Sequence, residues 1–274
     1  MKLRTILFLL ALPLACVRGA EYEAGPALLA GKNTASDPIA ARAAFEKGAS
    51  LGQVLAKLQL GILCSNGTGG PRDDARALSL FSEAAAAGQR EALYNKGLFL
   101  LLGRGGPRDL DAALTTLAES AAAGSVHAHV KLADLFYFGT EGLKQDRTRA
   151  LPHVKAAAEA GDAWACNILG TMAEYGYAMP MDRGIALHWF MIAAGKNNAK
   201  AQANLGRMLR ADKPTPADQV QAYMWLRLAA EQGDPAAKIL LADHVLGLSP
   251  AQRSEGDGMI SEFRNRLDIK AGER

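Results

Sequence analysis

Histidine and cysteine are the residue types in this 274-residue chain that most readily bind a metal or act in catalysis at neutral pH. His127 and His129 stand two residues apart, and side chains at that spacing on a helix do not face each other. No second pair of ligands follows at the spacing of a metal site, and the sequence contains no serine-nucleophile, zinc-protease, phosphate-loop or dinucleotide-binding motif. We therefore expect no catalytic residue, no metal and no cofactor, and interpret the histidines as structural or surface residues.

Three cysteines are too few to form a disulfide framework. We expect Cys64 and Cys166 to be buried, unpaired thiols. Cys16 ends the stretch "LPLAC", which raises the alternative of an outer-membrane lipoprotein acylated at this residue. The order Pro13, Leu14, Ala15 departs from the usual lipoprotein signal, in which leucine comes three residues before the cysteine and a small residue comes two before it.

The N-terminus resembles a secretory signal peptide. Basic residues at Lys2 and Arg4 precede the apolar run "TILFLLALPLA", which has the length of a signal peptide and is too short to span a bilayer. Cleavage is expected after Gly19 or Ala20, which makes residues 1–20 the signal peptide and places the mature chain in the periplasm or outside the cell. No later run approaches 18 apolar residues, so the sequence predicts no transmembrane segment.

Removal of the signal peptide changes the charge of the chain. The precursor carries a net charge of +3, and residues 1–20 contribute three basic side chains and no acidic one. The mature chain is therefore neutral overall, which gives no reason to expect nucleic acid or an anionic membrane as a partner.

An internal repeat decides how these residues are positioned. A glycine, replaced once by asparagine, recurs at intervals of 36 or 37 residues: Gly52, Gly88, Gly124, Gly161, Asn197 and Gly233. An aspartate recurs with the same spacing: Asp73, Asp109, Asp146, Asp182 and Asp218. A small residue recurs nine positions after each glycine or asparagine: Gly61, Gly97, Ala133, Gly170, Gly206 and Ala242. The aspartate suits the N-cap of a helix, and the glycine or asparagine suits the left-handed residue after a helix.

Each repeat therefore predicts a helix A, a turn and a helix B, with apolar residues at helical spacing between the fixed positions. Two short amphipathic helices cannot bury both apolar faces alone, so the pairs must stack. The prediction is an all-α, right-handed superhelical solenoid over residues 38–268, with five repeats (54–89, 90–125, 126–162, 163–198 and 199–234) and capping helices at both ends. Residues 21–37 are expected to form a flexible linker and residues 269–274 a tail.

At this point the pattern resembles the Sel-one-like repeat family, a tetratricopeptide-like group of solenoids. The stretches "GTGGPRDDARAL" (67–78), "AQANLG" (201–206) and "QAYMWLRLAAEQGDPAA" (221–237) fit its outline, and Trp189 and Trp225 occupy its tryptophan position. The resemblance covers about residues 38–265 and implies an adaptor that binds proteins or peptides on a concave face. A branch of the family linked to β-lactam binding carries paired cysteines in each repeat; this chain lacks them, so that activity is not expected.

By analogy with related helical repeats, helix A lines the concave groove. The residues that we expect to face a partner there are Glu91, Tyr94, His127, Asp134, Tyr137, Trp164, Asn167, Glu174, Tyr175, Lys200, Arg207 and Arg210. They predict an aromatic and apolar middle beside a cationic end, which suits a peptide with an apolar anchor and an acidic tail. For Leu98, Leu101, Leu102 and Phe138, the groove and the core between helices are both open.

The sequence thus favours an exported, non-catalytic scaffold that binds an unidentified protein or peptide in the bacterial envelope. The alternative is a binder or hydrolase of a small cell-wall-related molecule in the same groove.

Overall fold

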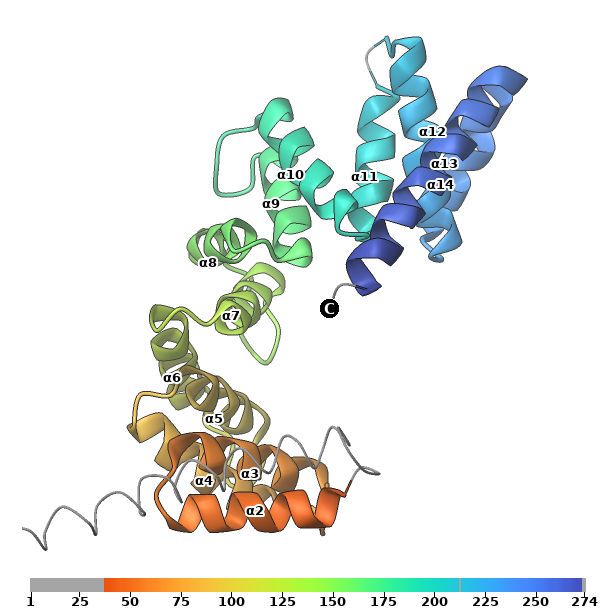
Figure 1. Ribbon diagram of the computed structural model, residues 1–274. Coiled ribbons are helices and arrows are strands. Elements are labelled where there is room, and N and C mark those ends of the chain that lie inside the picture. The colour runs from red at the N-terminus through yellow and green to blue at the C-terminus, as the bar shows by residue number, and fades with distance from the viewer. Residues whose placement is uncertain (1–36, 212, 273–274) are drawn as a thin grey trace, which may run out of the picture. The chain divides into compact units, whose positions relative to one another are not determined.

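The computed structural model describes residues 37–211 and 213–272. The expected signal peptide with its cleavage site at Gly19 or Ala20, Cys16 and nearly all of the expected linker lie outside the described residues. Within the described ranges every regular element is a helix, and the helices pack in consecutive pairs (Figure 1). The predicted all-α solenoid of helix pairs is confirmed.

The chain divides into two compact units, Met1–Leu132 and Ala133–Arg274, and the division falls within one helix. The described part of the first unit contains α2 (Pro38–Ser50), α3 (Val54–Asn66), α4 (Asp74–Ala86), α5 (Arg90–Leu102), α6 (Leu110–Ala122) and the first part of α7 (Val126–Phe138). The second unit contains the end of α7, then α8 (Arg147–Glu159), α9 (Ala163–Tyr175), α10 (Arg183–Gly195), α11 (Ala199–Leu209), α12 (Pro216–Glu231), α13 (Pro235–His244), the short 3-10 helix η1 (Val245–Gly247) and α14 (Pro250–Gly272). The last helix thus continues past residue 268, where the sequence predicts the array to end.

The expected aspartate caps begin four of the five helices B. The side chains of Asp73, Asp109, Asp146 and Asp182 each accept a hydrogen bond from a backbone N–H in the first turn of α4, α6, α8 and α10. The fifth expectation is wrong, because Thr215 and not Asp218 caps α12. Asp218 lies three residues further on and accepts from the Thr215 backbone N–H at 2.9 Å, so the two form a reciprocal capping box.

The turn from each helix B to the next helix A is very short. All five repeat glycines have positive φ, and Asn197 adopts the same left-handed conformation at φ 63°, as predicted. In five of these six turns the residue that follows caps the next helix through its side chain: Gln89, Ser125, Asp162, Asn198 and Asp234. The exception is Gln53 after Gly52, whose side chain makes no such bond. One left-handed residue and one cap therefore suffice to reverse the chain.

The recurring small residue lets helix A approach helix B of the same repeat. A Cβ atom built on Gly170 would lie 2.8 Å from the Phe190 ring, and one on Gly97 would lie 2.7 Å from Leu117 Cγ. Gly61 and Gly206 face Phe81 and Leu226 in the same way. The large residue of helix B thus fills the space that a side chain on helix A would need.

The two cysteines in the described residues are unpaired and buried, as expected. Burial raises the pKa of both thiols, which suits a packing role more than a reactive one.

We expect Gly170→Ala to lower the free energy of unfolding by about 1–3 kcal/mol, because the added methyl group overlaps the Phe190 ring in a close-packed interior. The matched control is Gly195→Ala, at the end of α10, where an added Cβ meets nothing within 4 Å. That substitution should leave stability unchanged or raise it by up to about 1 kcal/mol, because alanine favours a helix more than glycine does. Urea unfolding followed by circular dichroism measures both; equal stability of the two variants would contradict the close-approach account.

Candidate interaction surface

The predicted partner-facing residues of the first unit lie on α5 and α7. The rings of Tyr94 and His127 lie 5.8 Å apart between centroids, with His127 exposed and Tyr94 half-buried. Burial raises the pKa of the Tyr94 hydroxyl. Burial also acts to raise the pKa of Glu91, but hydrogen bonds from Arg90 and Gln89 outweigh it and leave that pKa below its usual value. The structure therefore brings Tyr94 and His127 together.

In the second unit, two of the three basic residues expected at the cationic end are neutralised. Arg207 donates to both carboxylate oxygens of Glu174, at 2.6 and 2.7 Å. Arg210 donates to the Asp243 carboxylate and to the Leu240 carbonyl oxygen. Only Lys200 is left exposed without a described ion pair. The free positive charge expected at this end is therefore much smaller than the sequence suggests.

Two adjacent positions of helix A separate core from surface. The thirteenth residue after the repeat glycine is buried in two repeats, with Leu101 fully enclosed and Tyr137 only 6% exposed. The fourteenth is half exposed in three repeats: 53% for Leu102, 50% for Phe138 and 49% for Tyr175. Leu101 therefore belongs to the core between helices, whereas Leu102 and Phe138 belong to the surface.

Burial also limits Tyr137 and Asn167 as partner contacts. Asn167 is 5% exposed and accepts a hydrogen bond from Asn204 Nδ2 at 3.1 Å, which ties α9 to α11. Asp134 on α7 is half-buried. These residues support the surface more than they form it.

A continuous series of ring contacts marks the second unit. We call the following residues the aromatic surface: Phe138, Trp164, Tyr175, Tyr177 and Arg147, with the buried Tyr137 as the ring that links Arg147 to Phe138. Phe138 lies 4.9 Å from Tyr137 and 6.5 Å from Trp164 between ring centroids. Tyr175 and Tyr177 stack at 5.6 Å. The Arg147 guanidinium joins the two groups, because it lies 3.7 Å from the Tyr177 ring centroid and 5.5 Å from that of Tyr137.

Sequence reasoning missed Tyr177 and Arg147, because it considered helix A alone. Tyr177 lies in the turn after α9, and Arg147 is the first residue of α8. The signal that could have found them is position, since both lie next to the helix ends that carry Phe138 and Tyr175.

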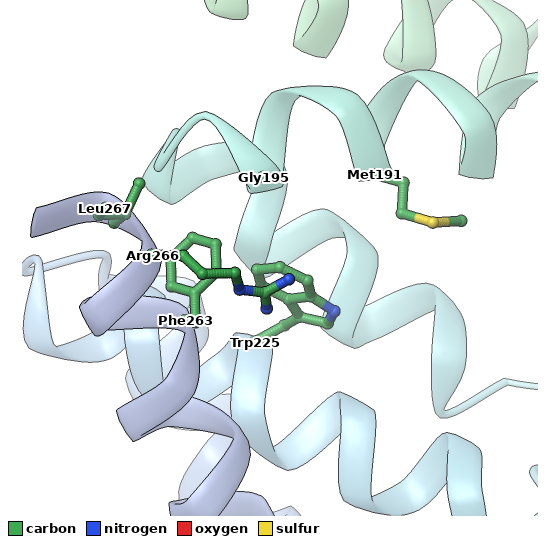
Figure 2. A pocket seen from close by; sticks show the side chains of 6 residues that line it. All are labelled: Met191, Gly195, Trp225, Phe263, Arg266 and Leu267. Carbon is green, nitrogen blue, oxygen red and sulfur yellow. The ribbon is translucent and has the colours of Figure 1, made fainter. Parts of the chain in front are cut away.

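A hollow of about 320 Å³ lies elsewhere in the second unit, on helices B and the closing helix. Met191 and Gly195 of α10, Trp225 of α12, and Phe263, Arg266 and Leu267 of α14 line it. Figure 2 shows Phe263 and Arg266 extending from α14 toward Trp225, and the rings of Trp225 and Phe263 meet edge to face at 5.4 Å. Its volume is at the lower end of the range of ligand pockets, about 300–1,000 Å³. It contains none of the residues predicted for the groove.

Within residues 37–211 and 213–272, no cluster of three or more histidine, cysteine, aspartate or glutamate side chains is arranged to hold a metal ion. No helix among those residues is both long enough and apolar enough to cross a membrane.

Comparison with known proteins places these features in a family. The model of the Sel1 repeat matches residues 54–89, 90–125, 126–162, 165–198 and 199–234. No curated protein matches the chain in sequence.

Solved structures that share the fold include the two that follow. The crystal structure of c5321, a protective antigen of uropathogenic Escherichia coli with an SLR fold, is 26% identical with a TM-score of 0.72. The match covers 84% of this chain but 49% of the antigen, so the chain spans about half of that protein's length. A Sel1 repeat protein from Oxalobacter formigenes is 23% identical, with a TM-score of 0.64 and coverage of 77% of this chain and 84% of that one.

We expect Phe263→Ala to release α14, because Phe263 is 5% exposed and its ring supports both Trp225 and the hollow. Truncation of a buried phenylalanine costs about 3 kcal/mol or more, and a terminal helix of a repeat array loses its contacts locally. Limited proteolysis should then cut within residues 250–266, which stay intact in the parent chain. Leu246→Ala, at a residue that is 85% exposed, is the control and should leave the cleavage pattern unchanged. Identical digestion of all three proteins would contradict this role.

Proposed function

The chain belongs to the Sel1 repeat family, and on that premise we propose that it is an exported, non-catalytic scaffold that binds a protein or peptide partner in the bacterial envelope through helices A. Proteins built from Sel1 repeats generally mediate protein–protein interaction. The observation that carries the proposal for this chain is the aromatic surface of the second unit. There Phe138 and Tyr175 are half exposed and belong to one series of ring contacts, and contiguous exposed apolar area marks interaction sites on soluble proteins.

Aromatic side chains are the strongest anchors of protein interfaces, because they bury a large area at a small cost in side-chain entropy. The fixed positions of the repeat are occupied by caps, left-handed turns and close helix packing. The fourteenth residue of helix A takes part in none of these, so its identity is free to serve a partner.

Export is proposed from the N-terminal sequence alone. If the signal peptide is removed as proposed, the protein recovered from the periplasm or medium of an expressing bacterium begins at Ala20 or Glu21 in an intact-mass measurement. A diacylglyceryl mass on Cys16, abolished by Cys16→Ser together with membrane attachment, would support the lipoprotein alternative instead. A chain that keeps Met1 and stays in the cytoplasm would contradict export in either form.

Partner capture tests the surface. A bait with Tyr94→Ala, Trp164→Ala and Tyr175→Ala should recover at least about tenfold less partner from an envelope extract than the parent chain, because loss of interface anchors costs more than about 1.4 kcal/mol in binding.

The matched control removes three large exposed side chains that are not on helix A, by Met181→Ala, Ile185→Ala and Met191→Ala; these residues are 72%, 40% and 56% exposed. The control bait should recover partner as the parent does. Loss of partner from the control bait, with normal recovery by the helix A variant, would move the binding surface to helix B.

A further inference from the structure

Arg147 is the cation of the aromatic surface that lacks an acceptor. Its guanidinium stacks 3.7 Å from the Tyr177 ring centroid, and its Nε atom is enclosed without a hydrogen-bond partner. Among the residues that the structure describes, no carboxylate pairs with it. Because a guanidinium carries five N–H donors in one plane, a cation held in this way still has donors to offer.

The comparable arginine of the first unit shows what a satisfied side chain looks like in this fold. Arg104 lies 4.3 Å over the Phe99 ring, also next to the end of a helix A. It donates to the Asp74 carboxylate at 2.6 and 3.1 Å and to the Ser65 carbonyl oxygen at 3.1 Å. The bonds from Arg104 and Arg72 to this carboxylate hold the pKa of Asp74 well below its usual value. Arg147 has the stacking but not the carboxylate.

Two of the three basic residues expected at the cationic end are not available in the same way. Arg207 and Arg210 are paired with Glu174 and Asp243. The positive charge that a partner meets among the rings is therefore that of Arg147. Its Nη groups are the accessible ones, since Nε alone is enclosed without a partner.

Exposed ring area follows this cation in both directions along the series of contacts, at Phe138 and at Tyr175. One side leads through Tyr137 to Phe138 and Trp164, and the other leads through Tyr177 to Tyr175. A ligand that covers both sides has apolar groups before and after its anionic group. An acidic side chain inside a peptide meets that requirement, whereas a C-terminal carboxylate has neighbours on one side only.

We propose that Arg147 recognises an aspartate or glutamate side chain within a partner segment whose flanking residues are apolar or aromatic. The inference rests on the proposed scaffold function and specifies the partner for it. The planar guanidinium would hold the carboxylate through two parallel N–H···O bonds, while the rings on either side take up the flanking side chains. Burial of the partner's carboxylate is costly unless a donor such as Arg147 pairs with it. The contact therefore discriminates between partner sequences as well as adding affinity.

The test is selection of random dodecapeptides displayed on phage against the purified protein. Peptides selected by the parent chain should be enriched in one aspartate or glutamate flanked on both sides by apolar residues. Synthetic copies of the best binder should lose at least about tenfold in affinity when that acid becomes the neutral amide, which corresponds to about 1.4 kcal/mol. Arg147→Glu should reverse the preference, so that lysine replaces the acid at the same position.

Two further variants keep the result interpretable. Arg147→Gln should abolish the preference for the acid while shifting the melting temperature by less than about 4 °C, since an unpaired guanidinium contributes little to folding. Arg207→Gln, at an arginine already paired with Glu174, should leave the preference intact.

Selected peptides without acid enrichment, or enrichment that survives Arg147→Glu, would overturn the inference. In that case the same peptides can be tested for binding to the variant with Tyr94→Ala, Trp164→Ala and Tyr175→Ala. If they no longer bind, the result would still support the scaffold function. Failure to select any peptide would also overturn the inference, and the partner-capture comparison would then decide the scaffold function separately.

Discussion

The close approach of helix A to helix B within each repeat is the contact on which the rest of this structure depends. A glycine on helix A leaves room for a phenylalanine or leucine of helix B, as at Gly170 with Phe190 and Gly206 with Leu226. Because the pair is held together at this position, the face of helix A that carries the fourteenth residue is not needed for packing within the repeat. A short turn with one left-handed residue and one side-chain cap then starts the next pair. Function can therefore vary along helix A without a change in the fold.

Local signals in the sequence are sufficient to predict the fold, because the caps and left-handed turns act within a few residues of chain. The aspartate spacing predicts four helix starts correctly, and Asn197 behaves as the glycine of the other repeats does. The error at Asp218 has a local cause as well. The loop before α12 offers Thr215 followed by proline, which is a better start than the aspartate three residues later.

The candidate surface is harder to predict, because its properties depend on residues about one repeat apart. Arg207 appears as a free cation in a helical register, but the partner that neutralises it is Glu174, 33 positions earlier. The difference between the buried Tyr137 and the exposed Phe138 is a rotation of one residue on the same helix. The pattern of helix A does not predict Arg147 at all, since this residue begins a helix B and contacts the Tyr177 ring from there. Such pairings follow from how successive repeats are stacked, which a single repeat does not encode.

The central claim is that the partner binds the aromatic surface, and not the exposed side chains of helix B. Site-specific incorporation of a photo-crosslinking phenylalanine derivative in expressing cells tests it most directly, at Tyr175 on α9 and at Met191 on α10, which are 49% and 56% exposed. The account predicts a discrete crosslinked species from position 175 and none from position 191. Crosslinking from position 191 alone would contradict it.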